Sequence, residues 1–383
     1  MLALAACLAL LTASPEAGPI KIGGYYPLTG GSAAMGTALR NGAHLAAEEV
    51  NAAGGVLGRK VVIVDADDEG KPDKGAQIVK DFADKERVVA ILGPGNTGVA
   101  NVSTGIANER HIPQIIPCAT GNKVNELFKE APQNYVFRLA ASDIIQSQMM
   151  VTEAFAARGR RRPAILSDET PYGAQGRARL VALLEQRGVK PVYQGTLKVG
   201  EKDMTAHVKA ARDAGADVLL LYALGNEGAA VARSLEKIGW KPEIIGTWIL
   251  SSAAFTKAAG PFGEGTVIPQ TFIESGVTDP TQLRFIESYR KAYGTAHIEP
   301  APAAAQGYDA LHFLALAIRQ AGTTEGPKVK AALEDIKDSF VGATGEYFKP
   351  WSSGDHEAVT PANVVWGMVK DGGVVPAPMA SAR

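Results

Sequence analysis

The feature that most constrains the fold of this chain is a regular alternation of short apolar runs with longer segments of helical periodicity. A short, continuously apolar run is typical of a strand buried on both faces, and an amphipathic segment is typical of a helix that covers a sheet. In the first part of the chain the pattern predicts strands at residues 20–26, 61–64, 88–92 and 112–116, with helices at residues 35–51, 73–85 and 99–108. The predicted fold class is therefore α/β, with a parallel sheet that helices cover on both sides.

The same architecture begins again after residue 143, although the two halves are not a sequence repeat. The pattern predicts helices at residues 144–158, 173–187, 204–214 and 228–238, and strands at residues 163–166, 191–197, 218–222 and 243–246. The last third has predicted helices near residues 280–293, 302–321 and 327–335, and strands near 266–268 and at 364–370, before a tail rich in Pro and Ala. A length of 383 residues suggests two domains. Because no flexible linker is found, we expect structured crossings between them.

Charge and composition exclude several classes of protein. The chain has 39 Lys and Arg against 40 Asp and Glu and no basic block, which argues against nucleic acid binding, since that affinity comes mostly from neutralised phosphates. No internal apolar run approaches the ~20 residues that span a bilayer. The six histidines are scattered without metal-ligand spacing. Two cysteines, Cys7 and Cys118, are too few for a disulfide framework or a Cys-rich metal site. We therefore expect no metal site.

The first 18 residues are interpreted as an export signal. Residues 1–12 are almost wholly Ala and Leu, and the small and turn residues at 13–15 are typical of a signal cleavage site. A buried apolar helix or a truncated start is the alternative. Residues 4–7, Leu-Ala-Ala-Cys, also resemble a bacterial lipoprotein cleavage box, which would make Cys7 the lipidated first residue. Without the signal, Cys118 has no disulfide partner, and an exported chain without disulfides is typical of a bacterial periplasm.

A Gly-rich loop, Gly93-Pro94-Gly95-Asn96-Thr97-Gly98, lies between a predicted strand and a predicted helix. It matches the dinucleotide-binding pattern formally, but it follows the third strand instead of the first, and no acidic residue stands about 20 residues later to hold a ribose. A turn that is tight for packing reasons alone is another alternative. We favour an anion site, because such a loop presents free N–H groups and the positive end of a helix dipole, to which Thr97 adds its hydroxyl. A small carboxylate is the ligand that fits best.

The next predicted strand ends in a similar turn, Pro117-Cys118-Ala119-Thr120-Gly121. Ligands of open parallel sheets bind beyond the carboxyl ends of the strands, so Thr97 and Thr120 are predicted to converge on one point. A catalytic role for Cys118 needs a nearby base, and no histidine stands in a recognisable triad arrangement; a buried or half-buried thiol is preferred. The acidic run at residues 65–69 is interpreted as a solvated turn and not as a cation site. Because base, nucleophile and oxyanion donors do not occur together, no enzymatic activity is expected.

Nearly the whole chain after residue 18 resembles a known family. The motif N-x-x-G-G-x-x-G-R at residues 51–59 is the most specific of the stretches that carry the resemblance; the others are residues 27–30, 67–68, Pro72, 117–120, 172–173, 200–203 and 307–310. They are similar to type I periplasmic binding proteins, and more narrowly to the leucine/isoleucine/valine-binding branch that serves ABC importers. The resemblance implies two doubly wound lobes joined by three crossings, with the ligand between them and no cofactor. The implied lobes are residues 19–142 with 271–358, and residues 143–270 with 359–383.

The resemblance also places the ligand. The first lobe is expected to hold a ligand carboxylate with hydroxyl and backbone N–H groups at two strand ends, which correspond to Thr97 and to Cys118 with Thr120. Cys118 would act through its main chain. Tyr172 matches an aromatic residue of the second lobe that closes over the ligand, and Asp143 matches an acidic residue near the first crossing.

The departures from the family concern the chemistry of the ligand. The family's amino-acid binders hold the ligand ammonium with an acidic residue at the position of Trp248, and they have aromatic residues at the positions of Met35 and Leu224. An ammonium buried without its counter-charge carries a desolvation cost of several kcal/mol. Trp248 instead offers an apolar face on which a ring stacks. We therefore hypothesise a carboxylate ligand with an apolar or aromatic body. Because Asp143 offers a counter-charge for an amine, an amino acid remains a second candidate ligand.

The predicted function is that of the periplasmic substrate-binding component of an ABC importer. As a monomer, the protein would capture a small carboxylate, close by a hinge motion and dock on the permease subunits. A ligand-sensing regulatory protein on the same fold is the first alternative, since fold does not determine function. An NAD-dependent dehydrogenase, based on the Gly93–Gly98 loop, is the second.

Overall fold

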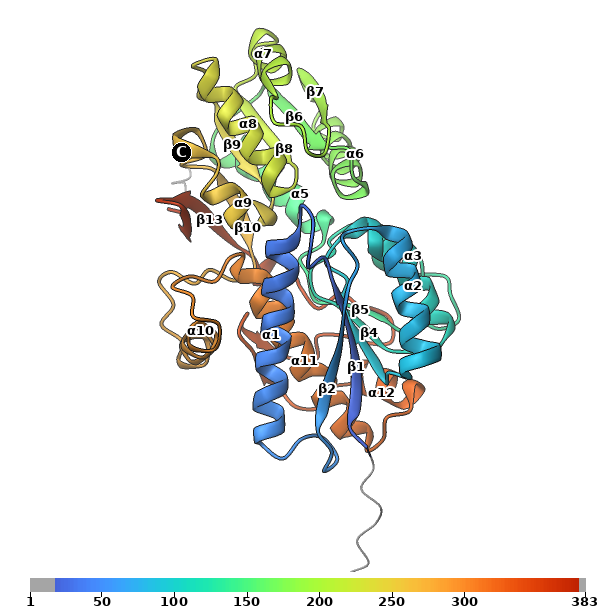
Figure 1. Ribbon diagram of the computed structural model, residues 1–383. Coiled ribbons are helices and arrows are strands. Elements are labelled where there is room, and N and C mark those ends of the chain that lie inside the picture. The colour runs from blue at the N-terminus through green and yellow to red at the C-terminus, as the bar shows by residue number, and fades with distance from the viewer. Residues whose placement is uncertain (1–17, 379–383) are drawn as a thin grey trace, which may run out of the picture.

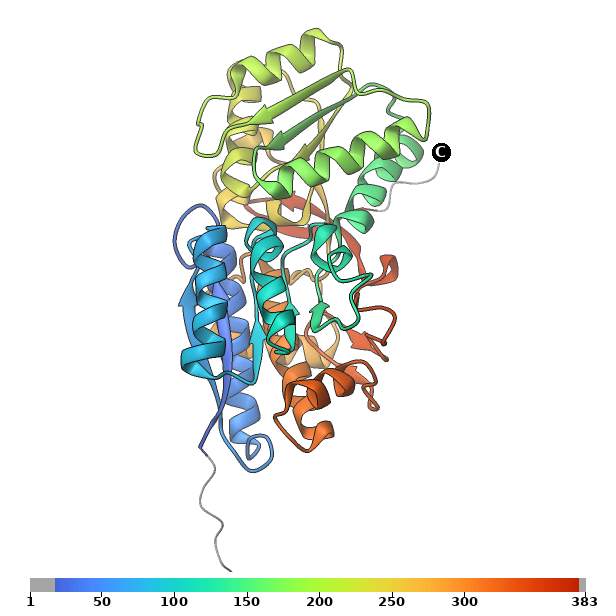
Figure 2. The ribbon, with the colours of Figure 1, turned by 90° about the vertical axis from the view of Figure 1, so that its right-hand side faces the viewer.

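The computed structural model describes residues 18–378 and consists of two lobes, stacked end to end in Figures 1 and 2. Each lobe is built on a sheet of its own, with five strands in one lobe and seven in the other. Residues 1–17 of the predicted export signal, with Cys7, lie outside the described residues, as do residues 379–383. Within the described range, no helix has the length and apolar character needed to cross a membrane.

The first sheet is wholly parallel. Its strands are β1 (Ile20–Tyr26), β2 (Val61–Asp67), β3 (Ala90–Leu92), β4 (Gln114–Ile116) and β5 (Val136–Arg138), in the order β2-β1-β3-β4-β5. The register places Ile22 between Ile63 of β2 and Ala90 of β3. The strand order reverses between β1 and β3, so the following helices leave on opposite faces, as in other doubly wound sheets.

Helices cover both faces of this sheet (Figure 1). On one face α1 (Ala33–Ala52) lies along α11 (Ala301–Ala321), and on the other α2 (Pro72–Asp81) lies beside α3 (Thr97–Glu109). Glycines permit the close approach of α1 and α11: a Cβ on Gly42 would lie 1.9 Å from the carbonyl oxygen of Ala304. The lobe is completed by elements before and after α11, namely α4 (Lys123–Glu126), α10 (Pro280–Tyr293), α12 (Gly326–Leu333), β11 (Phe340–Val341) and β12 (Glu346–Tyr347).

The second sheet repeats this winding. Five parallel strands follow the order β7-β6-β8-β9-β10, with bounds β6 (Pro163–Asp168), β7 (Tyr193–Leu197), β8 (Val218–Tyr222), β9 (Glu243–Gly246) and β10 (Val267–Gln270). Two antiparallel strands, β13 (Val365–Lys370) and β14 (Gly373–Pro376), extend it beyond β10. Its helices are α5 (Asp143–Thr152), α6 (Pro171–Glu185), α7 (Thr205–Asp213), α8 (Gly225–Lys237) and α9 (Ala253–Thr256).

The chain passes between the lobes three times. It leaves the first lobe after β5 for α5, which packs against α6, and it returns after β10 to α10, which packs against α1. It passes a third time between β12 and β13. The predicted fold class, two doubly wound lobes joined by structured crossings, is therefore confirmed, while the lobe boundaries after residues 142, 270 and 358 remain our proposal.

Four strands of the structure, β5, β11, β12 and β14, were absent from the sequence prediction. β5, β11 and β12 have only two or three residues each, too few for a pattern. β14 lies in the segment interpreted as a Pro/Ala tail, and it forms a hairpin with β13 through Asp371 and Gly372, whose φ angles are 51° and 75°. An Asp-Gly pair is a known signal for such a hairpin turn, so this strand was predictable.

The solvated turn predicted at residues 65–69 is also partly wrong. Asp68 is fully buried, and its Oδ1 accepts a hydrogen bond from the Gly70 N–H at 2.7 Å. The Asp68 N–H donates to the carbonyl oxygen of Tyr26 at 3.0 Å, which holds the turn against the end of β1. Burial raises the pKa of Asp68 to about 7. The local sequence does not encode this burial.

Candidate functional site

A small cavity between the lobes lies at the carboxyl ends of strands from both sheets. It is lined by Met35, Gly95, Asn96, Thr97, Cys118, Thr120, Tyr172, Leu224, Trp248 and Ile249. The lining segments include those that follow β1 and β3 in the first lobe and β6 and β8 in the second, where the strand orders reverse. This reversal point is the usual ligand position in doubly wound sheets. Both sheets therefore direct their binding edges at the same cavity.

The lobes are closed over this cavity. Its volume is about 20 Å³, which is room for about one water molecule and far below the roughly 300–1,000 Å³ of common ligand pockets. Thr97, Thr120 and Cys118 are each 2% exposed, and Tyr172 and Trp248 are each 7% exposed. We infer that a ligand enters only when the lobes separate.

Four helices begin at the cavity. Met35 lies in the first turn of α1, Thr97 is the first residue of α3, Tyr172 lies in the first turn of α6, and α8 begins directly after Leu224. The first N–H groups of a helix have no partner within the helix, and its amino end carries a partial positive charge. No charged side chain belongs to the lining that the described residues form. Any positive potential in the cavity therefore comes from helix ends and not from a Lys or Arg side chain in its lining.

Hydroxyl groups complete the first-lobe side of the cavity. The Gly121 N–H donates to Thr97 Oγ1 at 3.2 Å. Thr120 Oγ1 is buried and has no hydrogen-bond partner in the described part of the chain. A buried polar atom without a partner is costly and requires an explanation. The role of this hydroxyl in ligand binding stays a prediction.

The second-lobe side of the cavity is apolar, and hydrogen bonds hold its aromatic residues. Trp248 opens a single 3₁₀ turn directly after β9. Its N–H donates to Gln146 Oε1 at 3.2 Å, and its carbonyl oxygen accepts from Gln270 Nε2 at 2.9 Å. The Tyr172 hydroxyl donates to Thr247 Oγ1 at 2.6 Å. Buried amide groups thus hold the main chain of Trp248, and a buried hydroxyl holds the ring of Tyr172.

Asp143 is buried behind Thr120 and outside the lining. Its N–H donates to the Thr120 carbonyl oxygen at 2.8 Å, but neither carboxylate oxygen has a hydrogen-bond partner among the described residues. Burial raises the pKa of Asp143 to about 6, although the nearby Tyr222 and Thr120 hydroxyls and the Arg138 charge act to lower it. The hydroxyls therefore lie close to the carboxylate without the geometry of a hydrogen bond.

We expect Asp143→Asn to stabilise the protein in a pH-dependent manner. The pKa of this carboxyl is raised from 3.8 to about 6. Below about pH 4 the carboxyl is protonated and does not destabilise the fold, whereas the ionised carboxylate lowers the free energy of unfolding as the pH rises through 6. A shift of about two units corresponds to about 3 kcal/mol. Chemical denaturation should therefore show a gain of this order for the variant at pH 8 and none at pH 4. Equal effects at both pH values would contradict the prediction.

Asp309→Asn is the matched control for this experiment. Burial also raises the pKa of Asp309 to about 6. However, its carboxylate accepts hydrogen bonds from the Ala343 N–H at 2.6 Å and the Thr344 N–H at 3.0 Å. Because the amide weakens these bonds, the control variant should lose stability at pH 4, where Asp143→Asn is neutral.

The catalytic and metal interpretations gain no support. Burial raises the pKa of the Cys118 thiol, and a thiol that stays protonated is a poor nucleophile. In the part of the chain that the structure describes, no group of three or more His, Cys, Asp or Glu residues is arranged to hold a metal ion.

The structure brings seven of the eight predicted site residues to the one cavity: Met35, Thr97, Cys118, Thr120, Tyr172, Leu224 and Trp248. Their role in binding stays a prediction, and Asp143 lies one layer behind them. Sequence reasoning did not single out Asn96 and Ile249, although each is next to a predicted residue. It also missed Gln146 and Gln270, which hold Trp248 from segments far away in the chain and have no local signal.

Three comparisons place the chain among known proteins. The model of the family described as periplasmic binding protein matches residues 19–372. A Leu/Ile/Val-binding protein homolog of Brucella melitensis is 28% identical over 326 residues, which are 85% of this chain and 86% of that protein.

Solved structures share the fold. The crystal structure of a leucine-binding protein from Thermotoga maritima has a TM-score of 0.81 and 24% identity, and covers 94% of this chain and 98% of its own. A solute-binding protein of an ABC transporter from Rhodopseudomonas palustris, in complex with benzoate, has a TM-score of 0.79 and 20% identity, over 95% of this chain and 97% of its own.

Proposed function

Since the chain belongs to the periplasmic binding protein family, whose members are solute-binding proteins and not enzymes, we propose that it captures a small carboxylate with an apolar or aromatic body. It delivers this ligand in the periplasm, as a monomer, to the membrane subunits of an ABC importer. The observation that carries the proposal is the division of the cavity, with helix ends and hydroxyls on one side and Trp248 on the other.

The carboxylate end of the ligand lies against the first lobe in this proposal. Thr97 at the start of α3 and the unpartnered Thr120 hydroxyl supply hydrogen bonds, and the helix ends supply positive potential. The ring or alkyl body lies against Trp248 and Tyr172. Because the cavity lining has no acidic side chain among the described residues, an ammonium group has no direct counter-charge there.

Contacts between the lobes support a hinge mechanism. Asn226 Nδ2 of the second lobe donates to the Gly31 carbonyl oxygen of the first at 3.4 Å, and Lys257 pairs with Glu299 at 2.8 Å. These contacts and a ligand that touches both walls stabilise the closed form. A ligand drives closure only by its greater affinity for that form, so the contacts with Trp248 and Tyr172 control the response.

An amino acid is the second candidate ligand, and Asp143 favours it. This carboxylate is fully buried beside Thr120, and its oxygens have no hydrogen-bond partner in the described structure. An ammonium directed past Thr120 would supply the missing counter-charge. Similar folds occur in a leucine-binding protein and in a benzoate complex, so the fold itself admits either class.

A thermal-shift screen of the mature protein tests the proposal. We expect benzoate and related aromatic acids to raise the unfolding midpoint, because a ligand of the native state adds about 2.7 kcal/mol at one hundred times Kd. Leucine, isoleucine and valine should give smaller shifts or none. Larger shifts with these amino acids than with aromatic acids would favour the second candidate. Equal shifts with benzamide and benzoate would contradict the carboxylate site.

A further inference from the structure

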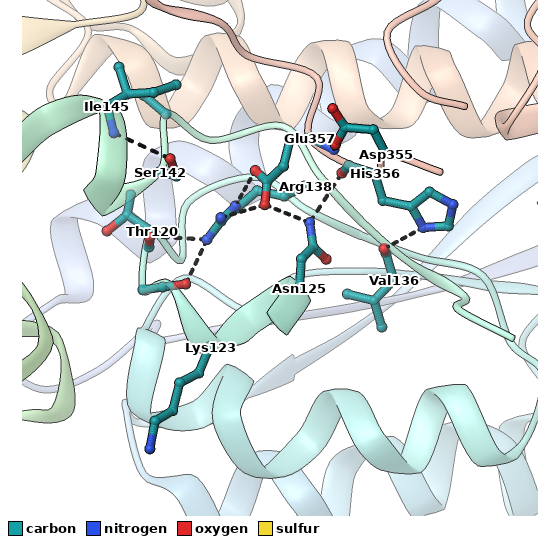
Figure 3. Close-up of polar contacts among 12 residues, drawn as sticks. Thr120, Lys123, Asn125, Val136, Arg138, Ser142, Ile145, Asp355, His356 and Glu357 are labelled. Atoms are coloured by element: carbon teal, nitrogen blue, oxygen red, sulfur yellow. Dashed lines mark hydrogen bonds and ion pairs between the residues drawn. The ribbon is translucent and has the colours of Figure 1, made fainter. Parts of the chain in front are cut away.

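Arg138 does not line the cavity, but it lies beside Thr120, which does (Figure 3). We propose that it is a positioning residue: it holds the Thr120–Gly121 turn in the orientation that binds the ligand carboxylate. This inference rests on the proposed function, because it concerns the same site. Arg138 belongs to β5, a strand that the sequence did not predict, and the proposal adds it to the residues that shape the site.

The Arg138 side chain is 1% exposed and uses both sides of its guanidinium group. Nη1 donates to the carbonyl oxygens of Thr120 at 3.0 Å and Gly121 at 2.6 Å. Nε and Nη2 donate to the two carboxylate oxygens of Glu357 at 2.7 and 2.5 Å. This is the planar, two-sided geometry that a guanidinium provides and an ammonium does not.

The contact with Thr120 determines where the next N–H group points. The carbonyl and N–H of a trans peptide face opposite ways. Arg138 and the Asp143 N–H hold the Thr120 carbonyl oxygen on the side away from the cavity. The Gly121 N–H on the other side donates to Thr97 Oγ1. A rotation of this peptide would break the hydrogen bond from the Gly121 N–H to Thr97 Oγ1 and leave Thr97 free to turn away from the ligand.

Glu357 in turn anchors Arg138 to the end of the first lobe. Asn125 Nδ2 donates to Glu357 Oε1 at 2.8 Å, and the Arg138 N–H donates to the His356 carbonyl oxygen at 2.8 Å (Figure 3). The Ala358 N–H donates back to the Arg138 carbonyl oxygen at 3.0 Å. The chain then continues towards the third crossing. Arg138 therefore connects the carboxylate-binding turn to a segment that leads into the hinge.

The test uses acetate as the smallest carboxylate and acetamide as its neutral match. Both are titrated into the ¹⁵N-labelled protein, and the Gly121 amide resonance reports binding at the turn. We expect Arg138→Lys to weaken acetate binding about tenfold, equivalent to about 1.4 kcal/mol. Acetamide binding should weaken less, because hydrogen bonds from the oriented donors to a neutral amide are weaker than those to a carboxylate. The milder Glu357→Gln, which leaves Arg138 in place, should weaken acetate binding by a smaller factor.

The matched control is Arg158→Lys. Arg158 donates to Glu153 at 2.8 Å and to Glu243 at 3.4 Å in the second lobe, far along the chain from the turn. This variant should bind acetate as the wild type does.

Three results are decisive. A wild-type Gly121 resonance that acetate does not shift would refute the carboxylate site of the proposed function. Unchanged acetate affinity in both Arg138→Lys and Glu357→Gln, or equal losses for acetate and acetamide, would refute the positioning role alone. If Arg138→Lys does not fold, the acetate and acetamide affinities of Glu357→Gln test the positioning role in the same way.

Discussion

Trp248→Glu is expected to weaken binding of an aromatic carboxylate such as benzoate by at least about 100-fold, or about 2.7 kcal/mol. The new carboxylate would stand in a cavity whose lining is otherwise uncharged among the described residues, beside four helix starts that attract the ligand's own carboxylate. Like charges brought together at a binding surface cost several kcal/mol, and the stacking contribution of about 0.5–1.5 kcal/mol is lost as well. Calorimetric titration measures the change directly.

Trp248→Phe is the control for this prediction. It retains an aromatic face and adds no charge, so the affinity should change only a few-fold. The same pair of variants tests the ligand class, because the glutamate supplies the counter-charge that an ammonium lacks in the wild type. We expect Trp248→Glu to gain affinity for leucine. Undisturbed benzoate binding by Trp248→Glu would show that the ring does not lie on this side chain.

Gly121→Ala is expected to have the second largest effect, again a loss of about 100-fold in carboxylate affinity. A Cβ at this position would lie 2.2 Å from Thr97 Cγ2 and 3.0 Å from Gln175 Oε1. Thr97 is almost fully buried, and Gln175 belongs to α6 of the second lobe and accepts from the Lys123 N–H at 3.4 Å. The methyl group therefore displaces a ligand-binding hydroxyl and also hinders closure, and such overpacking costs about 1–3 kcal/mol.

The chain offers a matched control in Gly105→Ala, in the same helix as Thr97. A Cβ there meets no atom within 4 Å. Because Ala is favoured over Gly in a helix by about 0.5–1 kcal/mol, this variant should be slightly more stable and bind normally. Calorimetry and thermal unfolding of both variants, with the best carboxylate of the screen, separate the site effect from a general effect. Normal binding by Gly121→Ala would place the ligand away from this turn.

Much of the site followed from the sequence because its residues belong to segments with local signals. Thr97 and Thr120 stand in glycine-containing turns at the ends of apolar strands, and such turns meet at one edge of a parallel sheet. Trp248 was singled out only because it stands where the amino-acid binders of the family have an acidic residue. The positions of Thr97 and Thr120 at the ends of strands were thus predictable from the sequence, while their role in binding stays a prediction that the experiments above test.

The sequence by itself determined the α/β class, because the alternation of apolar strands and amphipathic helices is a local property, and motifs such as residues 51–59 carried the family resemblance that implied two doubly wound lobes. Tertiary structure alone decided which side chains hold these segments in place. Arg138 and Glu357 are separated by 219 residues, and Gln146 and Trp248 by 102. Buried polar groups need partners wherever the fold supplies them. Such pairings arise from packing between distant segments, which no local periodicity or motif encodes.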